Sequence, residues 1–152
     1  MELLKRRILQ QGRVLSDRTL SVMKFLNHGV DPVLIREIGR EFARRFRELG
    51  VEVDRVLTVE SSGIAIGFAT AEELGVPFLF ARRRQALMNE GDYYSERVPS
   101  FTKGIVTQIM VAKELLQPGD KILYIDDFIA NGDAARGVVR IVEQAGAPIV
   151  GG

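Results

Sequence analysis

The sequence contains no cysteine and a single histidine, His28. Without cysteine the chain has no disulfide bonds, no thiolate metal sites and no cysteine nucleophile. One histidine excludes a metal centre built on two histidines, and a Ser-His-Asp triad would have to use His28 itself. No partner carboxylate for His28 is identifiable in the sequence, so we interpret it as a structural residue.

Long apolar runs are also absent. No stretch approaches the ~18 uninterrupted apolar residues that a membrane-spanning helix needs, and the charged start Met1–Arg7 contains no apolar signal core. We therefore expect a cytoplasmic protein that does not contact a membrane. Its 152 residues, 46% hydrophobic and 27% charged, are enough for one globular domain with a substantial core.

Neither sign of charge dominates. The 21 Lys and Arg residues against 20 Asp and Glu give a formal net charge of +1, so we expect no nucleic-acid partner. The basic residues are 16 Arg and 5 Lys. The planar guanidinium suits phosphates and carboxylates, although a general role in solvating helix faces would use the same residues.

Periodic patterns alternate between helix and strand. Asp31 is a good N-cap, Pro32 is tolerated at the first helical position, and apolar residues then recur every three to four positions up to Gly50. Further helices are predicted at 2–11, 64–74 and about 133–145, and strands at 55–59, 77–81, about 104–112 and 121–125. The expected apolar stripes are Leu3, Leu4, Ile8 and Leu9 in the first helix and Leu34, Ile38, Phe42, Phe46 and Leu49 in the second.

This alternation predicts an α/β fold, a mostly parallel twisted sheet flanked by helices, in one domain over 1–152. Ligands of such sheets bind at the carboxyl ends of the strands. Residues 82–103 break the pattern and begin with Arg82-Arg83-Arg84. An unpatterned segment of this length is usually functional or mobile, and the position of the arginines at a strand end favours anion binding over a solvated charge run.

The strongest functional signal lies in residues 122–134, where an apolar strand runs into Asp126-Asp127, then a short loop with Gly132, then a helix. Backbone N–H groups at a helix N-terminus bind anions, and glycine lets the backbone close on a phosphate. The two carboxylates are placed to accept hydrogen bonds from vicinal hydroxyls or to lie near a metal-bound substrate. These parts suit a sugar that carries a terminal phosphate; the alternative is a surface turn in which Asp133 caps the helix.

This cassette resembles the phosphoribosyl-diphosphate signature of type I phosphoribosyltransferases. The resemblance covers essentially the whole chain, and Phe25–His28 and Ala130–Gly132 point to the xanthine phosphoribosyltransferases. The other segments that carry it are Leu15–Asp17, Leu20, Asp31-Pro32, Ile38-Gly39, Glu41–Ala43, Arg45-Phe46, Glu60–Ala65, Gly75–Pro77, Phe80–Arg82 and Ser100–Lys103.

The resemblance implies transfer of 5-phosphoribose from 5-phosphoribosyl 1-diphosphate to N9 of xanthine, giving xanthosine 5′-monophosphate and diphosphate. It also implies a homodimer, a small hood over about 1–30 and a flexible flap over about 84–103. Mg²⁺ would arrive with the diphosphate rather than in a protein cage, since substrate phosphates commonly hold it.

The resemblance also implies a role for each site residue. Asp126 and Asp127 would hold the ribose hydroxyls and favour an oxocarbenium-like transition state. The 5-phosphate would be wrapped by Ala130, Asn131, Gly132, Asp133 and Ala134. The diphosphate would be bound by Glu60, Ser61, Ser62, Gly63, Arg82 and Lys103. The purine would contact Leu20 and Asn27.

Simpler interpretations exist for several of these residues. Leu20 is by default a core leucine, Asn27 a turn or cap residue, and Ser61-Ser62 the N-cap of helix 64–74. Tyr93 and Tyr94 suit either base stacking or a flap surface.

Two features depart from the family pattern. Asp133 is a carboxylate where a neutral residue is expected, and at ~4 Å from a phosphate it would cost several kcal/mol; we expect it to turn outwards and cap the helix. The family continues past Gly152 with a segment that includes a purine-contacting lysine, so guanine and hypoxanthine stay open as substrates.

Two other functions compete with this one. A regulator that binds the donor without catalysis would be expected to carry a DNA-binding helix pair or a basic patch, and neither is visible. A Rossmann-like nucleotide binder would need a Gly-x-Gly-x-x-Gly turn after its first strand, which is missing.

Overall fold

The computed structural model describes residues 1–17, 19–83, 90–100 and 105–152. Its main sheet has the strand order β5-β6-β4-β3-β7-β8. The parallel pairs are β3 with β4, β3 with β7 and β7 with β8, whereas β6 runs antiparallel to both β4 and β5. The bounds are β3 Arg55–Val59, β4 Phe78–Arg83, β5 Tyr93–Ser100, β6 Ile105–Ala112, β7 Ile122–Tyr124 and β8 Ile149–Gly151.

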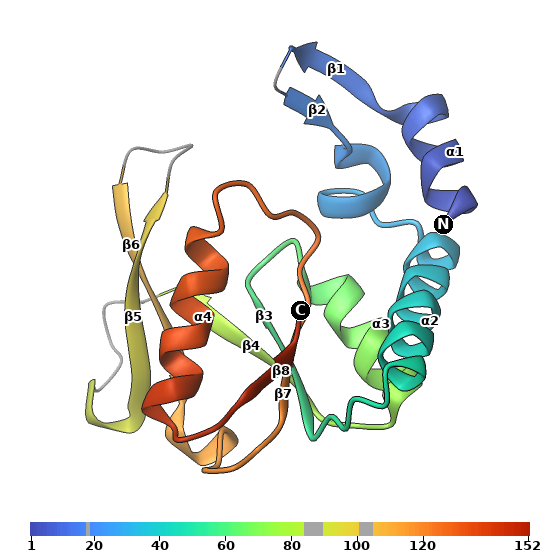
Figure 1. The fold of residues 1–152 in the computed structure, drawn as a ribbon. Helices are drawn as coiled ribbons and strands as arrows, with labels where there is room; N and C mark the ends of the chain where they lie inside the picture. Colours follow the sequence, from blue (N-terminus) through green and yellow to red (C-terminus); the bar gives the residue numbers. More distant parts are fainter. Residues whose placement is uncertain (18, 84–89, 101–104) are drawn as a thin grey trace.

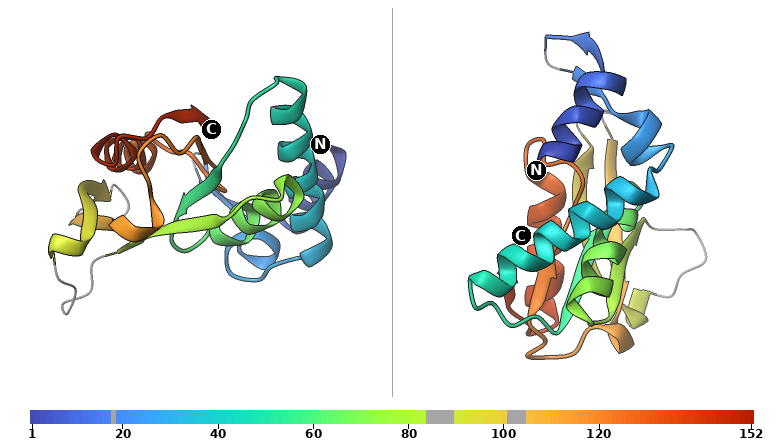
Figure 2. Two further views of the ribbon diagram at one scale, coloured as in Figure 1. Left: turned by 90° about the horizontal axis from the view of Figure 1, so that it is seen from below. Right: turned by 90° about the vertical axis from the view of Figure 1, so that its right-hand side faces the viewer.

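Helices cover both faces of this sheet, as the alternation predicts (Figures 1 and 2). The four long helices lie where they were expected, at α1 Glu2–Gln11, α2 Pro32–Glu48, α3 Ile64–Leu74 and α4 Asp133–Gln144. Shorter helices are the π-helix η1 Met23–Asn27 and the 3₁₀ helices η2 Glu90–Asp92 and η3 Lys113–Leu115. None of the helices in the described ranges is long and apolar enough to cross a membrane. The prediction of an α/β fold with a mostly parallel sheet is confirmed.

The alternation of side chains along β3 divides the core into two clusters. Leu57 and Val59 pack in one cluster with Val138 and Ile141 of α4, and Val56 packs in the other, with residues of α2 and α3. This follows from the period of two along a strand, which sends neighbouring side chains to opposite faces. The same parity applies to β4, where Leu79 and Ala81 belong to the α4 side.

The N-terminal segment expected to form the hood, about 1–30, contains α1, a hairpin of β1 Arg13–Ser16 and β2 Thr19–Ser21, and η1. It projects beyond the sheet (Figure 1). Asp31 attaches it: one carboxylate oxygen caps α2 by accepting from the N–H of Val33 and Leu34 at 3.0 and 3.2 Å, and the other lies 2.7 Å from the Arg7 guanidinium of α1. The predicted N-cap is confirmed, and it also links two helices.

Three local expectations were wrong. Leu9 and Leu49 are 86% and 73% exposed, so neither belongs to its predicted apolar stripe. Residues 82–103, expected to form a long loop, contain η2 and the eight-residue strand β5, which pairs along its length with β6; the flexible flap over about 84–103 stays a prediction. Pairing with a strand distant in sequence stabilises β5, and this contact leaves no local periodic pattern.

Contact between α2 and α3 gives the first prediction. A Cβ added to Gly39 of α2 would lie 2.6 Å from the carbonyl carbon of Ala69 in α3. Main-chain atoms cannot rotate away, so Gly39→Ala should force the helices apart and lower the free energy of unfolding by roughly 1–3 kcal/mol. Urea denaturation measures this, with exposed Arg36→Ala in the same helix as the control. An unchanged or higher urea midpoint for Gly39→Ala would contradict the tight packing.

Candidate functional site

The carboxyl ends of three parallel strands bring most of the predicted site residues to one edge of the sheet. β3 is central, with β4 and β7 as its neighbours. The loop Glu60–Gly63 follows β3, Arg82 is the second-last residue of β4, and Asp126-Asp127 come shortly after β7. If ligands bind at this edge, as expected, the loops after these three neighbouring strands form the site.

The carboxylate of Asp126 accepts two hydrogen bonds from its neighbours. The Tyr124 hydroxyl donates to its Oδ2 at 2.6 Å and the Asp127 N–H donates to its Oδ1 at 2.9 Å. Burial raises the pKa of the Asp126 carboxyl to about 6, against the pull of these two hydrogen bonds, and the Asp127 carboxylate adds to the rise.

Gly63 packs its backbone directly against this carboxylate. A Cβ on Gly63 would lie 2.4 Å from Asp126 Oδ1 and 2.2 Å from the Thr58 hydroxyl. Thr58 is fully buried in β3, and its hydroxyl makes no hydrogen bond within the described structure. Glycine at position 63 is thus a packing requirement that joins the β3 loop to the acidic pair.

Asp127 is tied to the same loop. Its Oδ1 accepts a hydrogen bond from the Ser62 hydroxyl at 2.8 Å. The simpler interpretation of Ser61-Ser62 as a helix cap is wrong, because the N-cap of α3 is Gly63 and no side chain caps the helix. Ser62 instead holds one of the two predicted catalytic carboxylates.

Glu60 faces the end of β4. Its Oε1 accepts from the Arg83 N–H at 2.6 Å, and its Oε2 lies 3.5 Å from Nε of Arg82. The Glu60–Ser61 peptide bond is cis. Glu60 therefore connects two strand ends, and its negative charge is partnered by Arg82.

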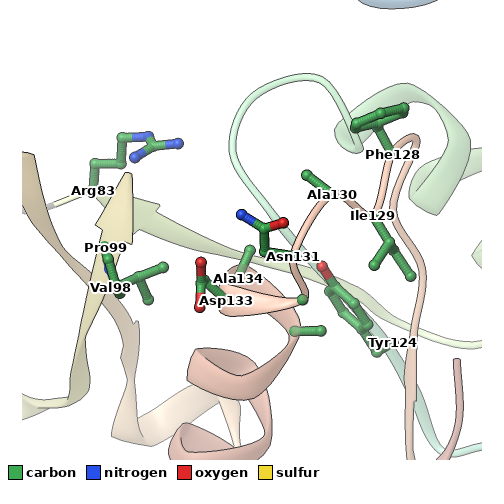
Figure 3. Close-up of a pocket in the computed structure, with 12 residues that line it drawn as sticks. Arg83, Val98, Pro99, Tyr124, Phe128, Ile129, Ala130, Asn131, Asp133 and Ala134 are labelled. Carbon is green, nitrogen blue, oxygen red and sulfur yellow. The ribbon is translucent and has the colours of Figure 1, made fainter. Parts of the chain in front are cut away.

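A pocket of about 180 Å³ lies at the N-terminus of α4 (Figure 3). Gly132, the N-cap of α4, has the left-handed backbone φ of 76° that glycine adopts without strain. The first N–H groups of a helix have no partner within it, so this end of α4 offers donors to an anion. The pocket is lined by Arg83, Val98, Pro99, Tyr124, Phe128, Ile129, Ala130, Asn131, Gly132, Asp133, Ala134 and Ala135.

Asp133 does not cap the helix, contrary to expectation. It is the first residue of α4, and its carboxylate forms an ion pair with Arg136 one turn further along. The Asp133 side chain is only 16% exposed and lines the pocket. The Asp133 carboxylate thus does not turn away from the pocket, and its negative charge is offset by the positive charge of Arg136.

Some predicted residues lie elsewhere. Leu20 and Asn27 are exposed on the hood and do not line this pocket. Lys103 lies outside the described residues.

Sequence analysis missed several residues that line the pocket, including Tyr124, Phe128 and Ile129. Phe128 and Ile129 are 74% and 63% exposed. Two large apolar side chains directly after an acidic pair, where a solvated loop would be polar, were the available signal.

Comparisons with known proteins agree with this geometry. The chain is 52% identical over 151 residues to a xanthine phosphoribosyltransferase of Moorella thermoacetica, covering 99% of this chain and 76% of that protein. It is 50% identical to a xanthine phosphoribosyltransferase of Stutzerimonas stutzeri, covering 99% and 78%. The chain belongs to the xanthine phosphoribosyltransferase family.

The fold comparison gives the same superfamily, while a scan of family models found no match. The solved adenine phosphoribosyltransferase of Rhodothermus marinus superposes with a TM-score of 0.75 at 26% identity, covering 99% of this chain and 84% of that one. Membership of the xanthine phosphoribosyltransferases thus rests on sequence, and the phosphoribosyltransferase fold rests on structure.

Burial of Asp126 gives a pH-dependent prediction for this phosphoribosyltransferase. Its folded pKa, about 6, is above the ordinary 3.8, so the stability linked to its protonated form is present below about pH 4 and is lost as pH rises through 6. Asp126→Asn should raise the free energy of unfolding at pH 8 by on the order of 1 kcal/mol, and the gain should vanish at pH 4.

Thermal unfolding of both proteins at pH 4, 6 and 8 tests this, with exposed Asp17→Asn as the matched control. A difference that is the same at all three pH values would show that charge burial is not its cause.

Proposed function

We propose that this chain transfers the 5-phosphoribosyl group from 5-phosphoribosyl 1-diphosphate to N9 of xanthine, forming xanthosine 5′-monophosphate and diphosphate in purine salvage. The observation that carries the proposal is that Tyr124, which lines the pocket at the start of α4, donates a hydrogen bond to Asp126 of the acidic pair that follows β7. This arrangement occurs in a chain 52% identical to a protein named for that activity.

The 5-phosphate would lie against the loop of Ala130, Asn131, Gly132, Asp133 and Ala134. Backbone N–H groups of the first turn of α4 supply donors, and the helix dipole favours a negative group there. Gly132 lets the chain turn closely around the phosphate. The Asp133–Arg136 pair supports this assignment, because it offsets the carboxylate that would otherwise repel the phosphate.

Asp126 and Asp127 would orient the ribose and stabilise the transition state. In the reaction the bond from ribose C1 to the diphosphate oxygen breaks, the bond from C1 to purine N9 forms, and the N9 proton is lost. Positive charge develops on the ribose ring between these events, and fixed carboxylates nearby lower its energy. The hydrogen bonds from Tyr124 and Ser62 hold the two carboxylates in place for this role.

The leaving diphosphate would bind at the loop Ser61–Gly63 with Arg82 and Lys103. In this proposal Glu60 is a positioning residue rather than a ligand, because Arg82 and the Arg83 N–H occupy its carboxylate. A free carboxylate at this position would repel the diphosphate. The contacts of Glu60 with Arg82 and the Arg83 N–H therefore support a diphosphate site beside Glu60.

Mg²⁺ would enter with the diphosphate. Mg²⁺ is commonly held by substrate phosphates together with few carboxylates. Bound in this way, Mg²⁺ neutralises charge on the leaving group.

The purine would be recognised from the hood, through Leu20 and Asn27. Both residues are exposed and so free to contact a ligand. We further propose a cytoplasmic homodimer, the form that the family resemblance implies; closed two-fold dimers are the commonest soluble oligomers. The chain spans about three-quarters of the length of the relatives above.

A turnover assay tests this function. The chain is incubated with 5-phosphoribosyl 1-diphosphate, Mg²⁺ and xanthine, guanine, hypoxanthine or adenine in separate reactions. We expect xanthosine monophosphate to form fastest. Preference for another base would contradict the xanthine assignment, and donor binding without turnover of any base would favour a binding module.

A variant of the acidic pair tests the mechanism. Asp127→Asn keeps the size of the side chain and removes its charge, so kcat with xanthine should fall roughly 100-fold, as when one electrostatic stabiliser is lost. Glu143→Gln, an exposed acidic residue near the end of α4, is the matched control. Equal kcat values for Asp127→Asn and the unchanged protein would remove Asp127 from the mechanism.

A further inference from the structure

The two arginines that end β4 face opposite sides of the sheet. Leu79 and Ala81 are buried in the cluster that contains α4, and Arg83 follows them at the same parity. In the register of β4 with β6, Arg83 pairs with Ile109, a member of that same cluster. Arg83 therefore projects on the α4 side, and Arg82 projects on the side of α3.

The two side chains also differ in their partners. Arg82 forms an ion pair with Glu60 at 3.5 Å. Arg83 uses only its backbone N–H toward Glu60, and its guanidinium has no ion-pair partner in the part of the chain that the structure describes. Figure 3 shows this guanidinium across the pocket from Ala130 and Asn131.

The charges of the pocket make this arginine distinctive. Its charged lining residues are Arg83 and Asp133, and the Asp133 carboxylate is already paired with Arg136. Arg83 is thus the charge that remains available to a ligand. The opposite wall offers the first N–H groups of α4, so both walls favour an anion.

We propose that Arg83 binds the 5-phosphate of the donor and of the nucleotide product, closing the phosphate pocket from the β4 side. This inference rests on the proposed function and adds a residue to it. A phosphomonoester at the N-terminus of α4 would receive backbone donors from one side and a charge-assisted, fork-shaped donor from the other. Arg82, on the opposite face beside the β3 loop, would serve the diphosphate.

Binding of two probes separates these roles. Ribose 5-phosphate reports the phosphomonoester site, and inorganic diphosphate with Mg²⁺ reports the leaving-group site, both by calorimetry on the whole chain. Arg83→Met should weaken ribose 5-phosphate binding by about 10- to 100-fold and leave diphosphate binding within about twofold. Arg82→Met should show the reverse pattern.

Two further variants control the comparison. Arg83→Lys keeps the charge without the planar fork and should recover part of the lost affinity. Arg140→Met removes an exposed arginine of α4 that pairs with Glu96, and it should bind both probes normally. Thermal unfolding of each variant checks that the fold is retained.

The outcomes separate this inference from the function that it extends. If the unchanged protein forms xanthosine monophosphate but Arg83→Met binds ribose 5-phosphate normally, the Arg83 role is wrong and the function stands. Loss of diphosphate binding alone in Arg83→Met would likewise overturn it, by assigning Arg83 to the leaving group. An unchanged protein that binds neither probe would overturn both proposals.

Discussion

The close approach of the Gly63 backbone to the Asp126 carboxylate is the contact on which the site depends. The loop after β3 lies so close to the acidic pair after β7 that a Cβ at position 63 would overlap the Asp126 carboxylate. The hydrogen bond from Ser62 to Asp127 joins the same two loops. The parallel pairing of β3 with β7 sets the distance, and glycine at position 63 allows it. The chemistry of the site thus begins with a packing constraint between two strand ends.

The alternation of side chains on the central strands also determines where charged residues lie. The side chains of β3 and β4 alternate between the α4 side and the α3 side, because successive residues of a strand point to opposite faces of the sheet. The division continues past the core to the last residues of β4. Two adjacent arginines, alike in sequence, therefore reach different surroundings, one against Glu60 and one across the pocket from Asn131.

Local signals in the sequence were sufficient for much of this structure. The cap at Asp31 and the apolar spacing after it define α2, and the cassette at residues 122–134 contains its own strand, turn and helix. What sequence reasoning missed depends on distant or competing partners. β5 exists through pairing with β6, Glu60 is engaged by the end of β4, and Asp133 pairs with Arg136 instead of capping. To predict each of these contacts, one must know which of several possible partners a residue or strand pairs with, and local propensity does not give that information.

The raised pKa of Asp126 means that the ionised form of this carboxyl is destabilised in the folded protein. In the free protein, burial and the adjacent Asp127 carboxylate both oppose ionisation of Asp126. In the proposed reaction, a ribose ring that gains positive charge would attract both carboxylates and favour their ionised forms. This attraction would offset the repulsion between the carboxylates most strongly when the positive charge on the ring is largest. The acidic pair would therefore bind the transition state more tightly than the bound donor, which is the condition for electrostatic catalysis.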